Sequence, residues 1–182
     1  MTKRMFLPFL LVIFLLPILS HPDYRLVAHT TSQLGGQQMP YAWVMNLTFF
    51  SMGAAVLVDA FMTKKWPLSL RFLLTAFGLS FFMTGVFQSR SIDSFMAYDP
   101  LSDTLHSVFA TATGVSFALF ASSVFVIAQK KQQKIVAFLL LVISIAIPFL
   151  MQFSDYSGIL QRIMMILSFS WMIVLLQKPE RL

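Results

Sequence analysis

Six long apolar stretches, separated by short polar gaps, constrain this chain more than any other feature of its sequence. All but the first, which is shorter, have the roughly 17 to 25 residues that cross about 30 Å of hydrocarbon as a helix. The stretches cover residues 5–19, 41–62, 67–87, 105–128, 135–153 and 158–176. The sequence therefore predicts an all-α membrane protein in which residues 1–182 form one domain, a bundle of six transmembrane helices.

The composition agrees with this class of protein. Hydrophobic residues make up 58% of the chain and charged residues only 11%, whereas charged residues are about a quarter of a soluble domain. The net charge of +6 does not indicate nucleic-acid binding, because the basic residues lie in the gaps between apolar stretches. Because cysteine is absent, disulfides, thiolate nucleophiles, iron–sulfur clusters and covalently attached haem are excluded.

For the first stretch, a cleaved signal peptide is the alternative to a transmembrane helix. The stretch contains Pro8 and Pro17, and Lys3 and Arg4 precede it as they would in a signal peptide. Residues 18–20 would make a poor cleavage site. In either case the following loop emerges on the outer face.

The distribution of lysine and arginine predicts the orientation, because these residues are in excess in cytoplasmic loops. Ten of the 13 lie on one side of the expected bundle, and only Arg25, Arg90 and Arg162 lie on the other. The ten are Lys3, Arg4, Lys64, Lys65, Arg71, Lys130, Lys131, Lys134, Lys178 and Arg181. We therefore expect a multi-pass inner-membrane protein with both termini in the cytoplasm.

Ionisable residues of other kinds gather on the expected outer side. They are His21, His29, His106, Asp23, Asp93, Asp99, Asp103 and Asp155. Acidic residues contribute little to orientation, so this asymmetry indicates a polar site that opens to the outer face. Solvated loop residues are the alternative for Asp23, Asp93 and Asp155.

Residues 24–46, which include most of the first outer loop and the start of the second span, form the longest part of the chain that cannot face lipid. Asp23 is a suitable N-cap for a short helix that the glycine pair at 35–36 would end. The polar stripe of that helix would consist of Arg25, His29 and Ser32. We expect the loop to fold back over the mouth of the bundle, since irregular backbone at membrane depth is tolerated only against protein or water. A solvated interfacial helix is the alternative.

The second span carries Asn46, Gly53 and Ala60 at seven-residue spacing, which places them on one face. Asn46 is too polar to face lipid and needs hydrogen-bond partners. Gly53 and Ala60 would let a neighbouring helix approach closely. Asp59 lies about one turn from the lysine pair that follows this span, which predicts a neutralised structural carboxylate.

The fourth span begins with Asp103 and His106, whose spacing points a carboxylate and an imidazole in the same direction. The pair predicts a general base oriented by Asp103 or two ligands of a metal, with a structural histidine as the alternative. Ala110, Gly114 and Ala118 follow at four-residue spacing, which predicts a tightly packed small-residue face below His106.

In the last span, Gln161, Ser168 and Trp171 share one face. Arg162 lies one turn inside the outer end of this span, where it either extends to lipid headgroups or pairs with an acidic residue. The acidic candidates are Asp99, Asp103 and Asp155. In a pair, Arg162 would neutralise the site or clamp an anionic headgroup.

Several catalytic classes are excluded, because the sequence has no glycine-rich phosphate loop, no H-E-x-x-H and no G-x-S-x-G. No lysine lies deep inside a span, which excludes a retinal Schiff base. A nucleophilic Ser32 with His106 as base and Asp103 as orienter has the required residue types. Their spacing does not show that the three meet.

Three segments are distinctive in combination. They are Tyr24 with residues 29–35 (HTTSQLG), Pro40 and Asn46; residues 104–106 (TLH); and residues 158–162 (GILQR) with Trp171. Together they resemble the bacterial and archaeal membrane family catalogued as domain of unknown function 998, over nearly the whole chain. The resemblance implies a polytopic helical bundle and no established activity. Family members often carry a second histidine where this chain has Ala110, which argues against a two-histidine metal site.

We therefore predict a polar pocket at the outer leaflet that binds a membrane lipid or another amphipathic small molecule. Its predicted residues are His29, Ser32, Asn46, Asp103, His106, Gln161 and Arg162, with Trp171 as a further ligand-binding residue. No cofactor or metal is predicted, and the oligomeric state is left open.

Two alternatives remain. The first is a membrane-embedded hydrolase or transferase acting on lipid, with His106 and Asp103 as base, Arg162 as headgroup clamp, and water or Ser32 as nucleophile. The second is a structural subunit of a membrane complex, because a fold alone does not decide function.

Overall fold

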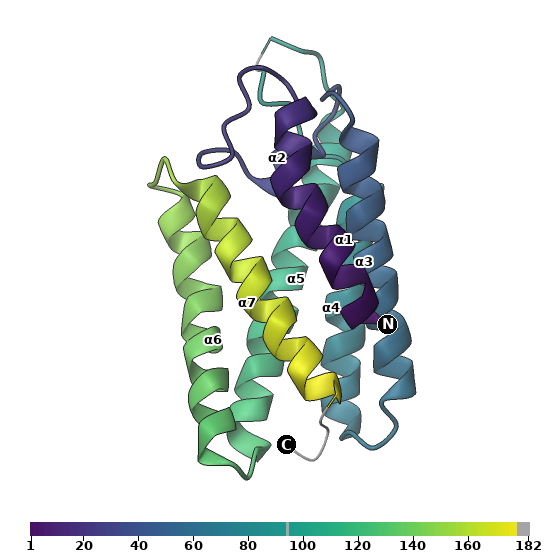
Figure 1. Ribbon diagram of the computed structural model, residues 1–182, viewed down its shortest axis with the longest axis vertical. Coiled ribbons are helices and arrows are strands. Elements are labelled where there is room, and N and C mark those ends of the chain that lie inside the picture. The colour runs from purple at the N-terminus through teal and green to yellow at the C-terminus, as the bar shows by residue number, and fades with distance from the viewer. Residues whose placement is uncertain (94, 178–182) are drawn as a thin grey trace.

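The computed structural model describes residues 1–93 and 95–177, and the regular elements in these residues are all helices (Figure 1). Six helical segments are long and apolar enough to cross a membrane: α1 (Thr2–Leu15) continued by the short 3-10 helix η1 (Leu16–Leu19), α3 (Ala42–Met62), α4 (Leu68–Val86), α5 (Pro100–Ile127), α6 (Lys131–Met151) and α7 (Ser157–Gln177). The short helix α2 (Thr31–Leu34) lies in the first loop. The predicted fold class is therefore confirmed.

The two ends of the bundle differ in their connections. Residues 20–41, 87–99 and 152–156 lie at one end, which we call the loop end. The short turns at 63–67 and 128–130 lie at the opposite end. Lys178 and Arg181, which entered the predicted orientation, are outside the described residues.

Helix α5 begins at Pro100, five residues before the predicted start of the fourth span. Asp99 caps the helix, because its Oδ1 accepts a hydrogen bond of 2.9 Å from the Leu101 N–H. Pro100 suits the first helical position, where no N–H partner is required. The 28 residues of α5 span about 42 Å, enough for the hydrocarbon and both interfaces.

Aromatic rings from α1, α4 and α7 form the centre of the core. Phe169 of α7 packs against Phe81 and Phe9, with ring centroids 5.2 and 5.4 Å apart in edge-on arrangements. Such geometry matches the positive ring edge with the negative ring face. These contacts tie α1 to α4 and α7, so that α1 is an integral part of the bundle.

Close packing of α3 on α4 requires glycine. A Cβ on Gly53 would lie 2.6 Å from the Cα of Phe82, and a Cβ on Gly85 would lie 2.5 Å from the carbonyl oxygen of Asn46. Ala60 is buried on the same face. The predicted close approach at Gly53 and Ala60 is thus confirmed.

The small-residue face of α5 differs from the prediction. A Cβ on Gly114 would meet nothing within 4 Å, and Ala110 is exposed. Helix α5 instead turns Phe117, Phe120 and Val124 into the core. Large side chains bury more apolar area than alanine or glycine, and this decides which face of α5 points inward.

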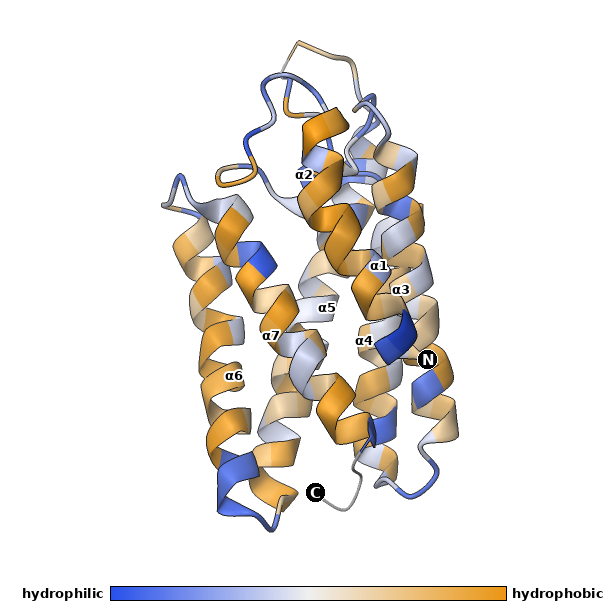
Figure 2. Cartoon of the chain, in the orientation of Figure 1, coloured by the Kyte–Doolittle hydropathy of each residue, from blue (hydrophilic) through white to orange (hydrophobic). Residues whose placement is uncertain are grey.

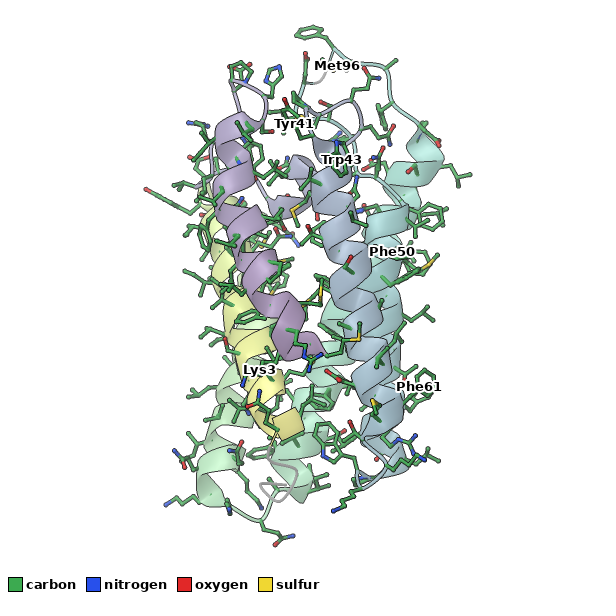
Figure 3. All side chains as sticks on the ribbon, turned by 45° about the vertical axis from the view of Figure 1, so that its right-hand side comes forward. Lys3, Tyr41, Trp43, Phe50, Phe61 and Met96 are labelled. Atoms are coloured by element: carbon green, nitrogen blue, oxygen red, sulfur yellow. The ribbon has the colours of Figure 1, made fainter. Side chains whose placement is uncertain are left out.

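The outer surface of the bundle is apolar along its length, whereas hydrophilic residues concentrate in the loops (Figure 2). Trp43, Phe50 and Phe61 are 65%, 40% and 63% exposed and point away from the bundle (Figure 3). An apolar surface of this extent is suited to lipid rather than water.

Asp59 is neutralised by a different group from the one predicted. Its carboxylate accepts hydrogen bonds from the Met1 amine (2.5 Å) and from the Thr2 backbone N–H (2.7 Å), and not from the lysines that follow α3. The start of α1 reaches Asp59 because α1 packs against α3.

Candidate functional site

Arg162 of α7 joins the loop end of the bundle to the first loop. Its Nε donates to the Ile13 carbonyl of α1 (3.0 Å), and its Nη1 lies 2.9 and 3.0 Å from the carbonyl oxygens of Leu26 and His29. Its Nη2 donates to the Tyr24 hydroxyl (2.8 Å). The guanidinium therefore connects α1, the first loop and α7.

The partners of Arg162 are neither headgroups nor acids. The side chain is 0% exposed, and within the described ranges no carboxylate lies within 4.0 Å of it. Five N–H donors in a rigid fork can satisfy several converging carbonyls at once. Both predicted interactions of Arg162 are thus replaced by carbonyl contacts, and its role in ligand binding stays a prediction.

Pro17 explains one of these contacts. In a regular helix the carbonyl of Ile13 would accept from residue 17, but proline has no N–H. The Arg162 Nε supplies the missing donor.

Tyr24 completes the environment of the guanidinium. Its hydroxyl lies 2.9 Å from the Thr30 carbonyl and 3.0 Å from the His29 carbonyl, to which it donates, and it accepts from Arg162. Burial raises the pKa of the Tyr24 phenol, and the positive charge of Arg162 opposes this only in part. The phenol is therefore a stable donor at neutral pH.

Helix α2 starts later than predicted. Its N-cap is Thr30 rather than Asp23: the Thr30 side chain accepts from the Gln33 N–H, and the Gln33 side chain accepts from the Thr30 N–H. This reciprocal capping box fixes the start of the helix. Consequently Arg25, His29 and Ser32 do not form one helical stripe.

Gln161 and Asn46 hold α2 in place. The Gln161 Oε1 accepts from the backbone N–H (2.8 Å) and the hydroxyl (2.7 Å) of Thr31, and Asn46 Nδ2 donates to the Gly35 carbonyl (2.9 Å). Asn46 thus has the buried partner that its polarity requires. The first loop folds back over the bundle, as predicted, and hydrogen bonds from α3 and α7 hold it there.

The loop before α5 is attached to the first loop. Gln37 Nε2 donates to the carbonyls of Gln88 (3.1 Å) and Asp99 (3.0 Å), and its Oε1 accepts from the Asp99 N–H (2.7 Å). The Ser89 hydroxyl donates to the carbonyl of Ser32 (2.8 Å). The two loops therefore form one hydrogen-bonded layer.

His106 lies beneath this layer and is oriented by α4. Its Nδ1 lies 2.9 Å from the Phe87 carbonyl and 3.2 Å from the Thr84 carbonyl, so Nδ1 carries the proton. The last carbonyls of a helix have no partner within that helix, and His106 supplies one. The side chain is 4% exposed, and its Nε2 has no hydrogen-bond partner.

Asp103 does not orient the imidazole as predicted. Its Oδ1 accepts from the Arg90 backbone N–H (2.9 Å), which fixes the turn after α4. The Ser32 side chain makes no hydrogen bond to His106 among the described residues, and these residues contain no group of three or more potential metal ligands. The catalytic assignment of Ser32, Asp103 and His106 stays a prediction.

Trp171 lies away from these residues. Its Nε1 donates to Gln133 near the opposite end of α6 (3.3 Å), and its ring packs edge-on against Phe117 and Phe120. Arg162 and Trp171 are separated by nine residues, or about 13 Å along the helix axis. The structure therefore does not bring Trp171 together with the other predicted site residues.

A cavity of about 360 Å³ opens at the loop end. It is lined by His21, Asp23, His29, Ile92, Asp93 and Phe95. His29 is the one member of the predicted site in this lining. None of the other predicted residues lines this cavity. Asn46, Gln161 and Arg162 instead support the first loop.

The stability of the first loop should decrease in acid through His29. Its Nδ1 accepts from the Arg25 N–H (2.9 Å), and its pKa is lowered by burial and by Arg25, with Asp23 opposing. Because the pKa of His29 is lower in the folded loop, the unfolded loop binds a proton more readily. The contribution of His29 to the stability of the loop is therefore fully present above the ordinary pKa of 6.5 and is lost as the pH falls below it. We expect amide exchange of residues 24–30, corrected for its intrinsic pH dependence, to accelerate at pH 5.

The matched variant is His29→Asn, whose side-chain oxygen can accept the same hydrogen bond without titrating. It should remove most of this pH dependence. An unchanged pH dependence would assign the effect to a group other than His29.

The six apolar helices and the hydrogen-bonded loop layer define a multi-pass membrane protein. The chain belongs to the family described as Protein of unknown function (DUF998), whose model matches residues 7–178. This match confirms the resemblance seen in the sequence. No curated protein and no solved structure matches the chain.

Proposed function

We propose that this protein binds a membrane lipid or a similar amphiphile at the loop end, with His106 Nε2 as the acceptor for a hydroxyl or amine of its headgroup. One observation carries the proposal: Nε2 is buried without a partner, while Nδ1 is fixed as a donor. A buried polar atom without a partner is costly. A ligand donor would remove this cost.

The depth of His106 fits a headgroup. The residue lies six positions after the start of α5, or about 9 Å along the axis. A helix of this length, centred in the bilayer, extends about 6 Å beyond the hydrocarbon at each end. His106 therefore lies close to the boundary between headgroups and acyl chains. The nearby α5 residues Leu101 and Val108 are 66% and 55% exposed and face the surroundings of the bundle.

The orientation that we propose is an inner-membrane protein with the loop end outside the cytoplasm. The excess of lysine and arginine at the opposite end supports this orientation. The ligand would then come from the outer leaflet.

A lipid hydrolase or transferase is the second candidate. An unprotonated Nε2 beside a fixed Nδ1–H is also what a general base requires. Binding of a lipid without its turnover would support the binding protein. Turnover of a lipid extract would support the enzyme.

The test compares two replacements of His106. The amide of His106→Asn can occupy the place of Nδ1 and keep the bond to Phe87, but it leaves nothing at the place of Nε2. The amide of His106→Gln restores a polar atom there. We expect native mass spectrometry after gentle extraction to show at least about tenfold less retained amphiphile for His106→Asn, with partial recovery for His106→Gln.

Both variants should express, and His106→Asn should melt like the unaltered protein. His106→Gln should melt at a lower temperature, because it leaves the Phe87 carbonyl without its donor. Equal retention by all three proteins would contradict binding through Nε2. Loss of lipid turnover with retained binding would favour the enzyme.

A further inference from the structure

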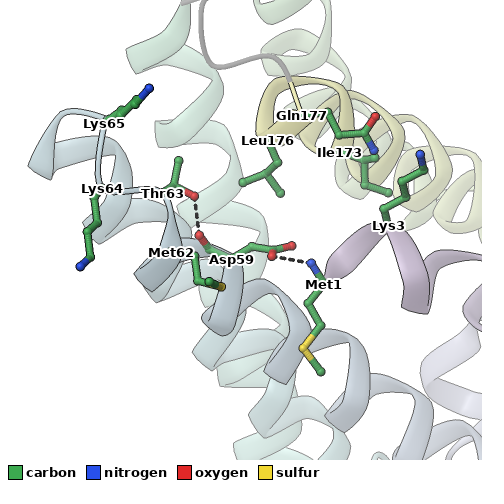
Figure 4. Close-up of a pocket in the computed structure, with 10 residues that line it drawn as sticks. All are labelled: Met1, Lys3, Asp59, Met62, Thr63, Lys64, Lys65, Ile173, Leu176 and Gln177. Carbon is green, nitrogen blue, oxygen red and sulfur yellow. Dashed lines mark hydrogen bonds and ion pairs between the residues drawn. The ribbon is translucent and has the colours of Figure 1, made fainter.

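A second cavity, of about 410 Å³, lies at the opposite end of the bundle (Figure 4). It is bounded by the first residues of α1, the end of α3 and the end of α7. Its position is separate from the loop end and from His106. No residue of the predicted site lines it.

The lining combines positive charge with apolar side chains. Lys3, Lys64 and Lys65 are exposed at the cavity. Met62, Ile173 and Leu176 provide apolar surface between them. An amphipathic ligand with a negative head would match both parts.

The acidic residue in the lining does not cancel this charge. Both oxygens of Asp59 are engaged by the Met1 amine and the Thr2 N–H. No ion pair within residues 1–93 and 95–177 involves Lys3, Lys64 or Lys65. Among the described residues, no acidic group neutralises their ammonium charges.

The lysines can reach such an anion. Figure 4 shows Lys64 and Lys65 on one side of Asp59 and Lys3 on the other. Lysine is a point charge on a flexible four-carbon stem, and it can bury this stem along apolar surface while its charge contacts a phosphate.

We infer that this cavity binds an anionic phospholipid of the adjacent leaflet, with its phosphate between the lysines and an acyl chain against Met62 and Leu176. Basic pockets between transmembrane helices recognise anionic lipid headgroups in this way. This inference is independent of the function proposed for His106.

The test uses the full chain in nanodiscs that contain phosphatidylglycerol and phosphatidylcholine. We expect the combined substitution Lys3→Gln, Lys64→Gln and Lys65→Gln to reduce retained phosphatidylglycerol on the order of tenfold in native mass spectrometry. Phosphatidylcholine should not change. Because the three side chains are exposed, the melting temperature should stay the same.

The matched control replaces Lys130, Lys131 and Lys134 by glutamine. These residues carry the same charge at the same end of the bundle but do not line the cavity. The control should retain phosphatidylglycerol. An equal loss in both triple variants would show general surface attraction and overturn the inference, as would no loss in either.

Inorganic phosphate at millimolar concentration distinguishes a lipid from a free anion. We expect it to displace little phosphatidylglycerol, because it lacks the acyl chain that contacts the apolar lining. Complete displacement would identify a phosphate site instead of a lipid site and overturn the inference.

Discussion

Replacing Arg162 by methionine should lower the free energy of unfolding by about 3–5 kcal/mol. The substitution leaves the carbonyls of Ile13 and Leu26 without their donor, and each buried group without a partner costs about 1–3 kcal/mol. The His29 carbonyl loses one of its two donors and keeps Tyr24. The Tyr24 hydroxyl loses its donor as well. Equilibrium unfolding in mixed micelles measures the effect.

Two variants serve as controls for Arg162→Met. Ile163→Met changes the next residue of the same helix, which is 43% exposed, and should alter stability by less than about 0.5 kcal/mol. Arg162→Lys keeps the charge but not the five-donor fork, so it should recover only part of the loss. Full stability in Arg162→Lys would show that charge alone holds the first loop.

Gly158→Ala should destabilise the protein by about 2–4 kcal/mol, although alanine favours helix formation. A Cβ at this position would collide with the carbonyl oxygens of Leu26 and His29, which are backbone atoms and cannot rotate away. The loop would have to move, and the hydrogen bond from the Ile159 N–H to the Val27 carbonyl (3.1 Å) would be lost. Unfolding and limited proteolysis of residues 20–41 would report both effects.

Gly114→Ala is the matched control, because a Cβ there would meet nothing within 4 Å. It should be neutral or stabilise the protein by up to about 1 kcal/mol through helix propensity. Equal destabilisation by both alanines would mean that the loop does not pack on α7 as described.

The spans were predictable because length and hydropathy decide which segments cross a bilayer. The backbone contact at Gly53 was predictable for a related reason, since a glycine aligned with Ala60 indicates close helix packing. The start of α2 was not predicted correctly. Asp23 and Thr30 are both good N-caps, and only Thr30 has Gln33 three residues later to complete a capping box.

The partners of the polar residues were the least predictable part. Arg162 and His106 both bind backbone carbonyls, and a carbonyl has no residue type by which a sequence could identify it. One signal was present in the sequence, because Pro17 leaves the Ile13 carbonyl without a helical donor. For the partner of His106 the signal was weaker: the C-terminal end of α4, like that of every helix, leaves its last carbonyls unpaired.

Cysteine cross-linking in native membranes tests most directly whether the first loop is folded onto α7. The chain contains no cysteine, so an introduced pair reports only on itself. Thr31→Cys with Gln161→Cys replaces two side chains in direct contact, whereas Thr31→Cys with Ile163→Cys places the second thiol on the exposed face of α7. The structure predicts efficient linkage by a short thiol cross-linker for the first pair and little for the second; equal yields from both pairs would contradict it.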